Sequence, residues 1–162
     1  MLQEIRENPG KGVYIEQVPF YPQETQMCGP AALASVIGYW SRDFDSEEGV
    51  GDIYKAKLKG TLPTDMLLFA RGKGFEATYY KGSIGDLKEK LSKNIPLILF
   101  LNLGFDVYPI GHYIVAVGYN DISEVIIAYS GLDKDMVIKY ADLESQWKKT
   151  NFSTLLVKVK KK

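Results

Sequence analysis

The chain contains a single cysteine, Cys28, and a single histidine, His112. With one thiol, no internal disulfide can form, so the cysteine count does not distinguish an oxidising from a reducing compartment. One thiol and one imidazole are also too few for a closed four-ligand zinc site of the Cys/His type. We therefore expect a protein that works without a metal or an organic cofactor.

The sequence also lacks net charge and long apolar runs. Its 20 basic residues balance 20 acidic ones, so no overall field would draw the chain to nucleic acid or to an anionic membrane. Nowhere do about 18 apolar residues follow one another, and no spanning helix is expected. The first residues also lack the apolar core of a signal peptide. The protein is then cytosolic, or extracytoplasmic if a targeting segment has been removed.

The 162 residues are 46% hydrophobic and 12% aromatic, which is enough for one domain with a real core over residues 1–162. The opening residues to Gly12 are polar and rich in turn formers, and we expect them to wrap the surface. Periodicity and turn residues predict helices at 30–40, 46–57, 64–70, 84–92 and 142–149. They predict strands at 13–18, 75–80, 96–103, 112–119, 124–129, 135–140 and 153–159. Helices first and strands later indicate an α+β domain, with N-terminal helices packed on an antiparallel sheet.

Cys28 lies at the start of the first of these long helices, whose apolar stripe includes Leu33, Val36 and Ile37. The positive end of the helix dipole and the free amide groups there favour a thiolate, which is the nucleophilic form of cysteine. Gly29 leaves room for a substrate backbone to approach. A small buried hydrophobic residue at a helix start is an equally good interpretation of this segment alone.

Two further residues complete a candidate catalytic group. His112 begins a core strand, where an imidazole is held rigidly and can still face a cleft, as a general base requires. Gln23 lies five residues before Cys28, and its amide could join the N–H of Cys28 in an oxyanion hole. Gln26 is a weaker candidate for that role. Each of these residues alone is more often structural; the single Cys and the single His at such positions favour a catalytic pair.

The residue that would orient the imidazole is less clear from the sequence. A hairpin turn near Asp121 would pair His112 with residues close to Ser130, and Ser130 is the best match. Asp133 and Asn102 remain open as alternatives. Asp121 itself would lie about eight residues away along the strand, roughly 26 Å, which is too far for direct contact.

Three segments of the sequence carry a family resemblance: Val18–Gln23 (VPFYPQ), Cys28–Leu33 (CGPAAL) and Gly111–Tyr119 (GHYIVAVGY). They resemble the bacteriocin-processing, double-glycine cysteine peptidases, in particular the free-standing bacterial branch of that family. The similarity extends from about Val18 to Trp147. One feature differs: the family usually carries an Asp-Pro pair on the strand after the histidine, and residues 128–131 read Ala-Tyr-Ser-Gly, without a carboxylate.

The resemblance implies a papain-like fold and a thiol protease that hydrolyses peptide bonds, typically after a small pair such as Gly-Gly. It implies that Gln23, Cys28 and His112 act as oxyanion donor, nucleophile and base, and that the partner is a peptide or protein. Relatives in this branch are commonly exported, which favours an extracytoplasmic location. Two alternatives stay open: another Cys-dependent acyl transfer, such as that of a peptidyltransferase, transglutaminase or deamidase, and a peptide-binding module that has lost turnover.

Overall fold

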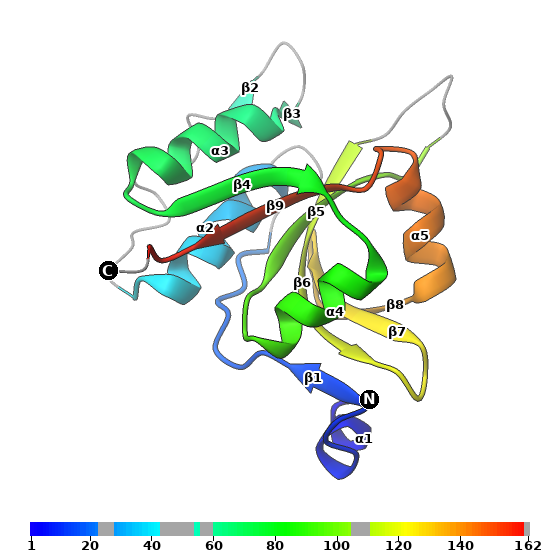
Figure 1. Cartoon of the computed structure of the whole chain (residues 1–162). Coiled ribbons are helices and arrows are strands. Elements are labelled where there is room, and N and C mark those ends of the chain that lie inside the picture. The colour runs from blue at the N-terminus through cyan, green and yellow to red at the C-terminus, as the bar shows by residue number, and fades with distance from the viewer. Residues whose placement is uncertain (23–27, 43–53, 56–59, 105–110, 161–162) are drawn as a thin grey trace.

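A seven-stranded, fully antiparallel sheet forms the centre of the protein in the computed structural model (Figure 1). The structure describes residues 1–22, 28–42, 54–55, 60–104 and 111–160. The strands are β1 (Gly12–Tyr14), β4 (Glu76–Lys81), β5 (Leu97–Asn102), β6 (Gly111–Asn120), β7 (Val125–Ser130), β8 (Asp133–Lys139) and β9 (Ser153–Lys158). Their order is β4-β9-β5-β6-β7-β8, with β1 added beside β6. The longest strand, β6, therefore lies in the middle of the sheet.

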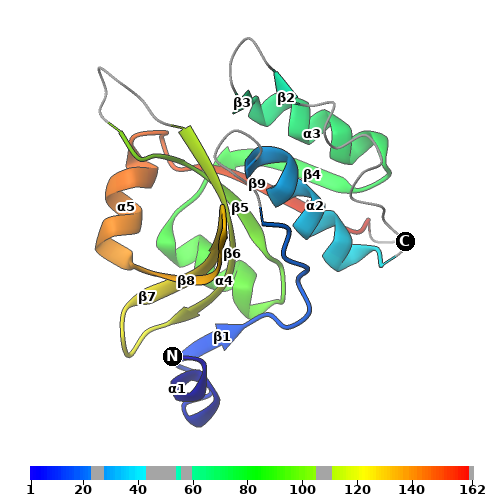
Figure 2. The same ribbon diagram turned by 180° about the vertical axis from the view of Figure 1, so that it is seen from behind.

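In the described part of the chain, the helices around this sheet are α1 (Leu2–Glu7), α2 (Cys28–Trp40), α3 (Pro63–Gly72), α4 (Ile84–Ser92) and α5 (Tyr140–Lys148). Figures 1 and 2 show α2 on one side of the central strands, and α4 and α5 on the other. Among the described residues, no helix has both the length and the apolar character needed to cross a membrane. Both faces of β6 are thus covered, which explains why all but its first residue is buried.

Most elements predicted from the sequence are confirmed, and with them the α+β fold class. The stripe on α2 is fully buried, with Leu33, Val36 and Ile37 all at 0% exposure. Strand β5 is buried at five of its six positions, as a nearly continuous apolar run requires. Helix α4 begins after Ser83, whose hydroxyl accepts a hydrogen bond from the backbone N–H of Asp86 at 3.0 Å.

Two expectations were wrong. The opening residues do not simply wrap the surface: Leu2–Glu7 form α1, because Ile5 is buried against the core and gives this short segment a packed face. The helix expected over 46–57 falls mostly outside the described residues. Its described part is not helical, because Tyr54–Lys55 form strand β2 and pair with Gly60–Thr61, strand β3. Both elements are too short to produce a clear periodic pattern in the sequence.

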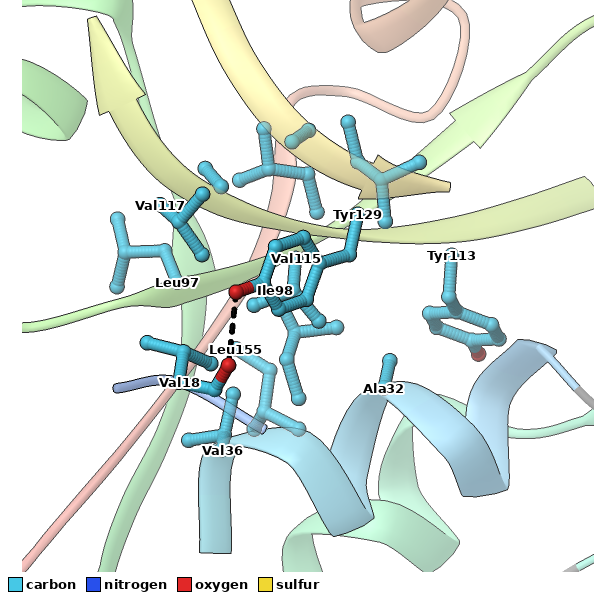
Figure 3. Packing of buried hydrophobic residues seen from close by; sticks show 14 of the residues in the cluster. Val18, Ala32, Val36, Leu97, Ile98, Tyr113, Val115, Val117, Tyr129 and Leu155 are labelled. Atoms are coloured by element: carbon cyan, nitrogen blue, oxygen red, sulfur yellow. Dashed lines mark hydrogen bonds between the residues drawn. The ribbon is translucent and has the colours of Figure 1, made fainter. Parts of the chain in front are cut away.

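The interface between α2 and β6 places the first turn of the helix against the beginning of the strand. Figure 3 shows Ala32 and Val36 of α2 beneath Tyr113 and Val115 of β6. Tyr129 of β7 reaches into the same layer, and its hydroxyl donates a hydrogen bond to the backbone oxygen of Val18 at 2.7 Å (Figure 3). This packing brings Cys28, the first residue of α2, next to the start of β6.

Candidate active site

Cys28 contacts the main chain of β6 directly beside His112. Its Sγ accepts a hydrogen bond from the backbone N–H of Tyr113 at 3.4 Å. The side chain is 7% exposed and lines a small cavity together with Phe20, Ala31 and Tyr129. The two unique residues of the sequence, 84 positions apart, are therefore brought to the same point of the fold.

The pKa of Cys28 is subject to two opposing effects. Burial raises the pKa of the Cys28 thiol above its ordinary value. Hydrogen bonds from the backbone amides of Tyr113, Gly29 and Cys28 itself oppose that shift and lower the pKa, but desolvation outweighs them. The helix terminus does supply amide donors to the sulfur, as expected, and these donors oppose the effect of burial on the pKa.

His112 is fixed through one of its two ring nitrogens. Its Nε2 lies 2.8 Å from Oγ of Ser130 on β7, while Nδ1 is buried and has no hydrogen-bond partner among the residues that the structure describes. Burial lowers the pKa of the imidazole. The histidine is therefore neutral at neutral pH, and one nitrogen is available for a further contact.

The tautomer of His112 decides what that free nitrogen can do. If Nε2 carries the proton and donates to the Ser130 hydroxyl, Nδ1 keeps a bare lone pair and can accept a proton. In the other tautomer, the Ser130 hydroxyl donates to Nε2 and Nδ1–H is a buried donor without an acceptor, which is costly. The arrangement thus favours an imidazole that is ready to act as a base at Nδ1.

Cys28 and His112 line different cavities beside the start of β6. Side chains alternate along a strand, so His112 and Tyr113 leave β6 on different sides. Cys28 lies on the α2 side with Tyr113, whereas His112 lines a separate cavity on the α5 side with Ile114. Among the described residues, no hydrogen bond joins Cys28 and His112.

The structure discriminates between the candidate partners of the imidazole. Ser130, the best match from the sequence, is the residue that contacts His112. Asp133 is exposed and is the strand partner of Ser130 rather than of His112. Asn102 accepts a hydrogen bond at Oδ1 from the backbone N–H of Gly104. Asp121, which was excluded on distance, binds Lys88 and Tyr140 instead.

Gln23 and Gln26 lie outside the described residues, so the predicted oxyanion donor is not placed. The segment leading toward them is anchored, because Val18 is 4% exposed and accepts the Tyr129 hydrogen bond. Phe20 packs edge-on against the Tyr129 ring, with 5.3 Å between ring centroids. Residues 18–20 are therefore held by β7, the strand whose Ser130 contacts His112.

Two residues near Cys28 were not found from the sequence. Tyr113 donates its backbone N–H to Cys28 and its hydroxyl to the backbone oxygen of Thr61 at 2.7 Å. The Thr61 side chain lies against Gly29, where an added Cβ would come within 2.8 Å of the Thr61 Cβ. Tyr113 could have been suspected from its position directly after the histidine; Thr61 carries no such signal, because its contact depends on the path of the chain.

No group of three or more His, Cys, Asp and Glu side chains gathers to hold a metal in the part of the chain that the structure describes. The chemistry available at the site is thus that of a buried thiol, a neutral imidazole held by a hydroxyl, and backbone amides at a helix start. These groups together are typical of nucleophilic attack on a carbonyl carbon.

Comparison with known proteins agrees with this chemistry. The model of the Peptidase_C39 like family matches residues 15–155. The chain belongs to this family. The match includes Cys28, His112 and Ser130, and it confirms the resemblance to double-glycine cysteine peptidases. No curated protein matches the chain at a significant level.

Solved structures of such peptidases share the fold. A C39-like peptidase from Bacillus anthracis superimposes with a TM-score of 0.77 at 16% identity, covering 94% of this chain and 100% of that one. The double-glycine-motif protease of an AMS/PCAT transporter, solved with its leader peptide, gives 0.69 at 23% identity, with 91% and 95% covered. The peptidase domain of Streptococcus ComA gives 0.68 at 20% identity, with 89% and 100% covered. The chain therefore has the papain-like fold of C39 cysteine peptidases.

Proposed function

We propose that this member of the family hydrolyses peptide bonds, with Cys28 as nucleophile and His112 as general base. Ser130 would orient the imidazole, and the Gln23 amide with the backbone N–H of Cys28 would hold the oxyanion. The observation that carries the proposal is the hydrogen bond from the backbone N–H of Tyr113 to the Cys28 sulfur. It fixes the single thiol at the helix start beside the only histidine of the chain.

The reaction starts from a neutral pair. Nδ1 of His112 takes the thiol proton as sulfur forms a bond to the substrate carbonyl carbon, and the carbonyl π electrons move to oxygen. The tetrahedral intermediate collapses, the C–N bond breaks, and the imidazolium gives its proton to the leaving amine. Water then attacks the thioester with His112 as base, which releases the acid and restores the thiol. Donors at the oxyanion are typically worth about 2.7–4 kcal/mol each.

A neutral resting pair suits the local electrostatics. Burial raises the pKa of the Cys28 thiol and lowers that of the His112 imidazole, so both groups rest uncharged. With Nε2 held by Ser130, Nδ1 is the ring nitrogen that would contact the sulfur and take its proton. Substrate binding at the end of β6 would stabilise that contact, because it excludes the water that solvates the open pair.

The proposed substrate is a peptide or protein cleaved after small residues such as Gly-Gly. Support comes from the double-glycine-motif protease, which was solved in complex with a leader peptide and has the same fold. Gly29 and the Thr61 side chain lie in close contact beside the nucleophile.

A peptide-binding module without turnover is the second candidate. It is favoured by the hydroxyl of Ser130 at the position where a carboxylate would hold an imidazolium more strongly. It is also favoured by the absence of a hydrogen bond between Cys28 and His112 among the described residues. Such a module would bind peptide with no accumulation of a thioester.

A peptide electrophile separates the two candidates. We expect a Gly-Gly peptide carrying a thiol-directed warhead to add its mass once to the protein, and Cys28→Ala to abolish the addition. His112→Ala should slow the addition strongly at neutral pH while leaving the circular dichroism spectrum unchanged. Peptide affinity without covalent addition to the wild-type protein would support the binding module instead. Repeating the cleavage with an added amine tests whether the acyl group passes to acceptors other than water.

A further inference from the structure

A second cavity, of about 530 Å³, lies on the opposite side of β6 from Cys28. Its floor is the α5 side of the sheet, including His112, Ile114 and Ser130, and its walls come from β8 and α5. Cavities of roughly 300–1,000 Å³ are typical of sites that bind small molecules or peptide segments. The hydrogen bond between His112 and Ser130 thus lies at the floor of a cavity that is large enough for a peptide side chain.

The catalytic chemistry indicates which part of a substrate this cavity would hold. In cysteine peptidase chemistry the acyl part of the substrate stays on sulfur, whereas the leaving amine takes its proton from the imidazole. The acyl part therefore lies toward Cys28, and the leaving part lies toward His112. His112 lines the larger cavity and Cys28 does not, so the larger cavity lies on the side of the leaving part.

We propose that the cavity on the His112 side binds the first residues of the leaving peptide, and that it selects apolar side chains there. This inference rests on the proposed function, because it uses the roles of Cys28 and His112. The proposed preference concerns the residues after the cleaved bond. The preference for small residues under the proposed function concerns those before it.

The cavity is lined by both apolar side chains and polar groups, as a site for an apolar peptide segment requires. Leu103, Met136 and Val137 contribute apolar side chains that are 44%, 42% and 46% exposed, respectively. Large apolar side chains that stay half exposed around one cavity lose contact with water when an apolar residue enters. On the α5 wall, Asp142 and Ser145 offer polar groups that can hydrogen-bond the main chain of a bound peptide.

The test uses direct binding, so that it does not depend on turnover. The probes are two fluorescent tetrapeptide amides with free N-termini, one of leucine and phenylalanine and one of serine and aspartate, measured by anisotropy on the full chain. The variants are Val137→Asp, which places a charge in the cavity, and Ser145→Trp, which fills it from an exposed position on α5. Val159→Asp is the matched control, since Val159 is 45% exposed and does not line the cavity.

We expect the apolar probe to bind at least about tenfold more tightly than the polar one, the gain from burying one large apolar side chain. Val137→Asp and Ser145→Trp should each remove that preference, and Val159→Asp should keep it. Equal binding of the two probes, or equal loss in all three variants, would overturn the inference while leaving Cys28 labelling, and so the proposed function, intact. If the protein preferred the apolar probe but Cys28 were not labelled, the proposed function would be overturned, and the cavity would remain a site for apolar peptides.

Discussion

The imidazole of His112 is held by a hydroxyl: its Nε2 lies 2.8 Å from Oγ of Ser130 on the neighbouring strand. A neutral hydrogen bond of this kind contributes about 0.5–1.5 kcal/mol, whereas a bond to a charged group contributes about 1.5–3 kcal/mol. Ser130 can therefore orient the ring but cannot stabilise an imidazolium as a carboxylate would. This weak support is the main way in which the site differs from the Asp-containing pattern that the family resemblance implies.

Replacing Ser130 by Ala should lower kcat by about tenfold, the equivalent of one neutral hydrogen bond of roughly 1.4 kcal/mol. KM should change little, because Ser130 acts on the ring and not on the acyl part of the substrate. Ser130→Asp should move the pKa of His112 upward, since a carboxylate beside Nε2 favours the charged imidazole. Steady-state kinetics give the first effect, and an NMR titration of the single histidine gives the second.

Ser130→Thr is the matched control for this series, because it keeps the hydroxyl. If Ser130→Ala and Ser130→Thr reduced kcat equally, packing rather than the hydrogen bond would explain the loss. If Ser130→Ala left kcat unchanged, the role of Ser130 as a positioning residue would be wrong.

The titration of His112 should follow from its burial. Desolvation lowers its pKa, so the NMR midpoint in the folded protein should lie below the ordinary value of about 6.5. The unfolded chain binds a proton near that value and the folded chain does not. The free energy of unfolding should therefore fall as the pH drops from about 6.5 toward the folded pKa, and be unaffected by His112 above that range. Since His112 is the only histidine, its signal needs no assignment. A midpoint at or above that value in the folded protein would contradict this description.

The contact between Gly29 and Thr61 predicts a coupled pair of substitutions. Gly29→Ala should destabilise the fold by about 1–3 kcal/mol, because its Cβ would come within 2.8 Å of the Thr61 Cβ. Adding Thr61→Gly should recover part of that loss, since the clashing atoms are removed. Urea unfolding of the two single variants and the double variant gives the coupling energy.

Gly72→Ala is the control for that pair, because an added Cβ there meets nothing within 4 Å. We expect it to leave the urea midpoint unchanged or slightly raised. Strictly additive effects of Gly29→Ala and Thr61→Gly would mean that the two residues do not press on each other.

Tyr129→Phe should weaken the anchor of the segment that leads toward Gln23. The substitution removes the hydrogen bond to the buried backbone oxygen of Val18, at a cost of about 1–3 kcal/mol for a group left without a partner. If this segment carries the oxyanion donor, kcat for peptide cleavage should fall, while alkylation of Cys28 by iodoacetamide keeps its rate. A parallel fall in both rates would indicate a general disturbance of the site.

The sequence predicted the main elements of the fold because their patterns are long. The stripe on α2, the apolar run of β5 and the cap at Ser83 each depend on local chemistry that a single segment displays. Helix α1 and strand β2 were missed or misassigned because they are too short for a period to show. Their structure depends on contacts with distant parts of the chain, such as the burial of Ile5.

The site was predicted in part for the same reason. The turn after β6 fixes the register of β7, and register led from His112 to Ser130. The hydrogen bond from Tyr113 and the contact of Thr61 depend on the packing of α2 against β6 and β3, which no local pattern encodes. The sequence also shows the helix terminus, whose amides lower the pKa of the Cys28 thiol, but not the depth of burial that raises it.

The most direct test of the Cys28–His112 pair is the pH dependence of Cys28 alkylation by a Gly-Gly peptide electrophile, in the wild type and in His112→Ala. We expect Cys28 of the wild type to be alkylated rapidly once the imidazole is neutral. It predicts that His112→Ala reacts only as the buried thiol itself ionises, at pH above the ordinary cysteine range. Two identical pH profiles would show that imidazole and sulfur do not act together, and would contradict the account.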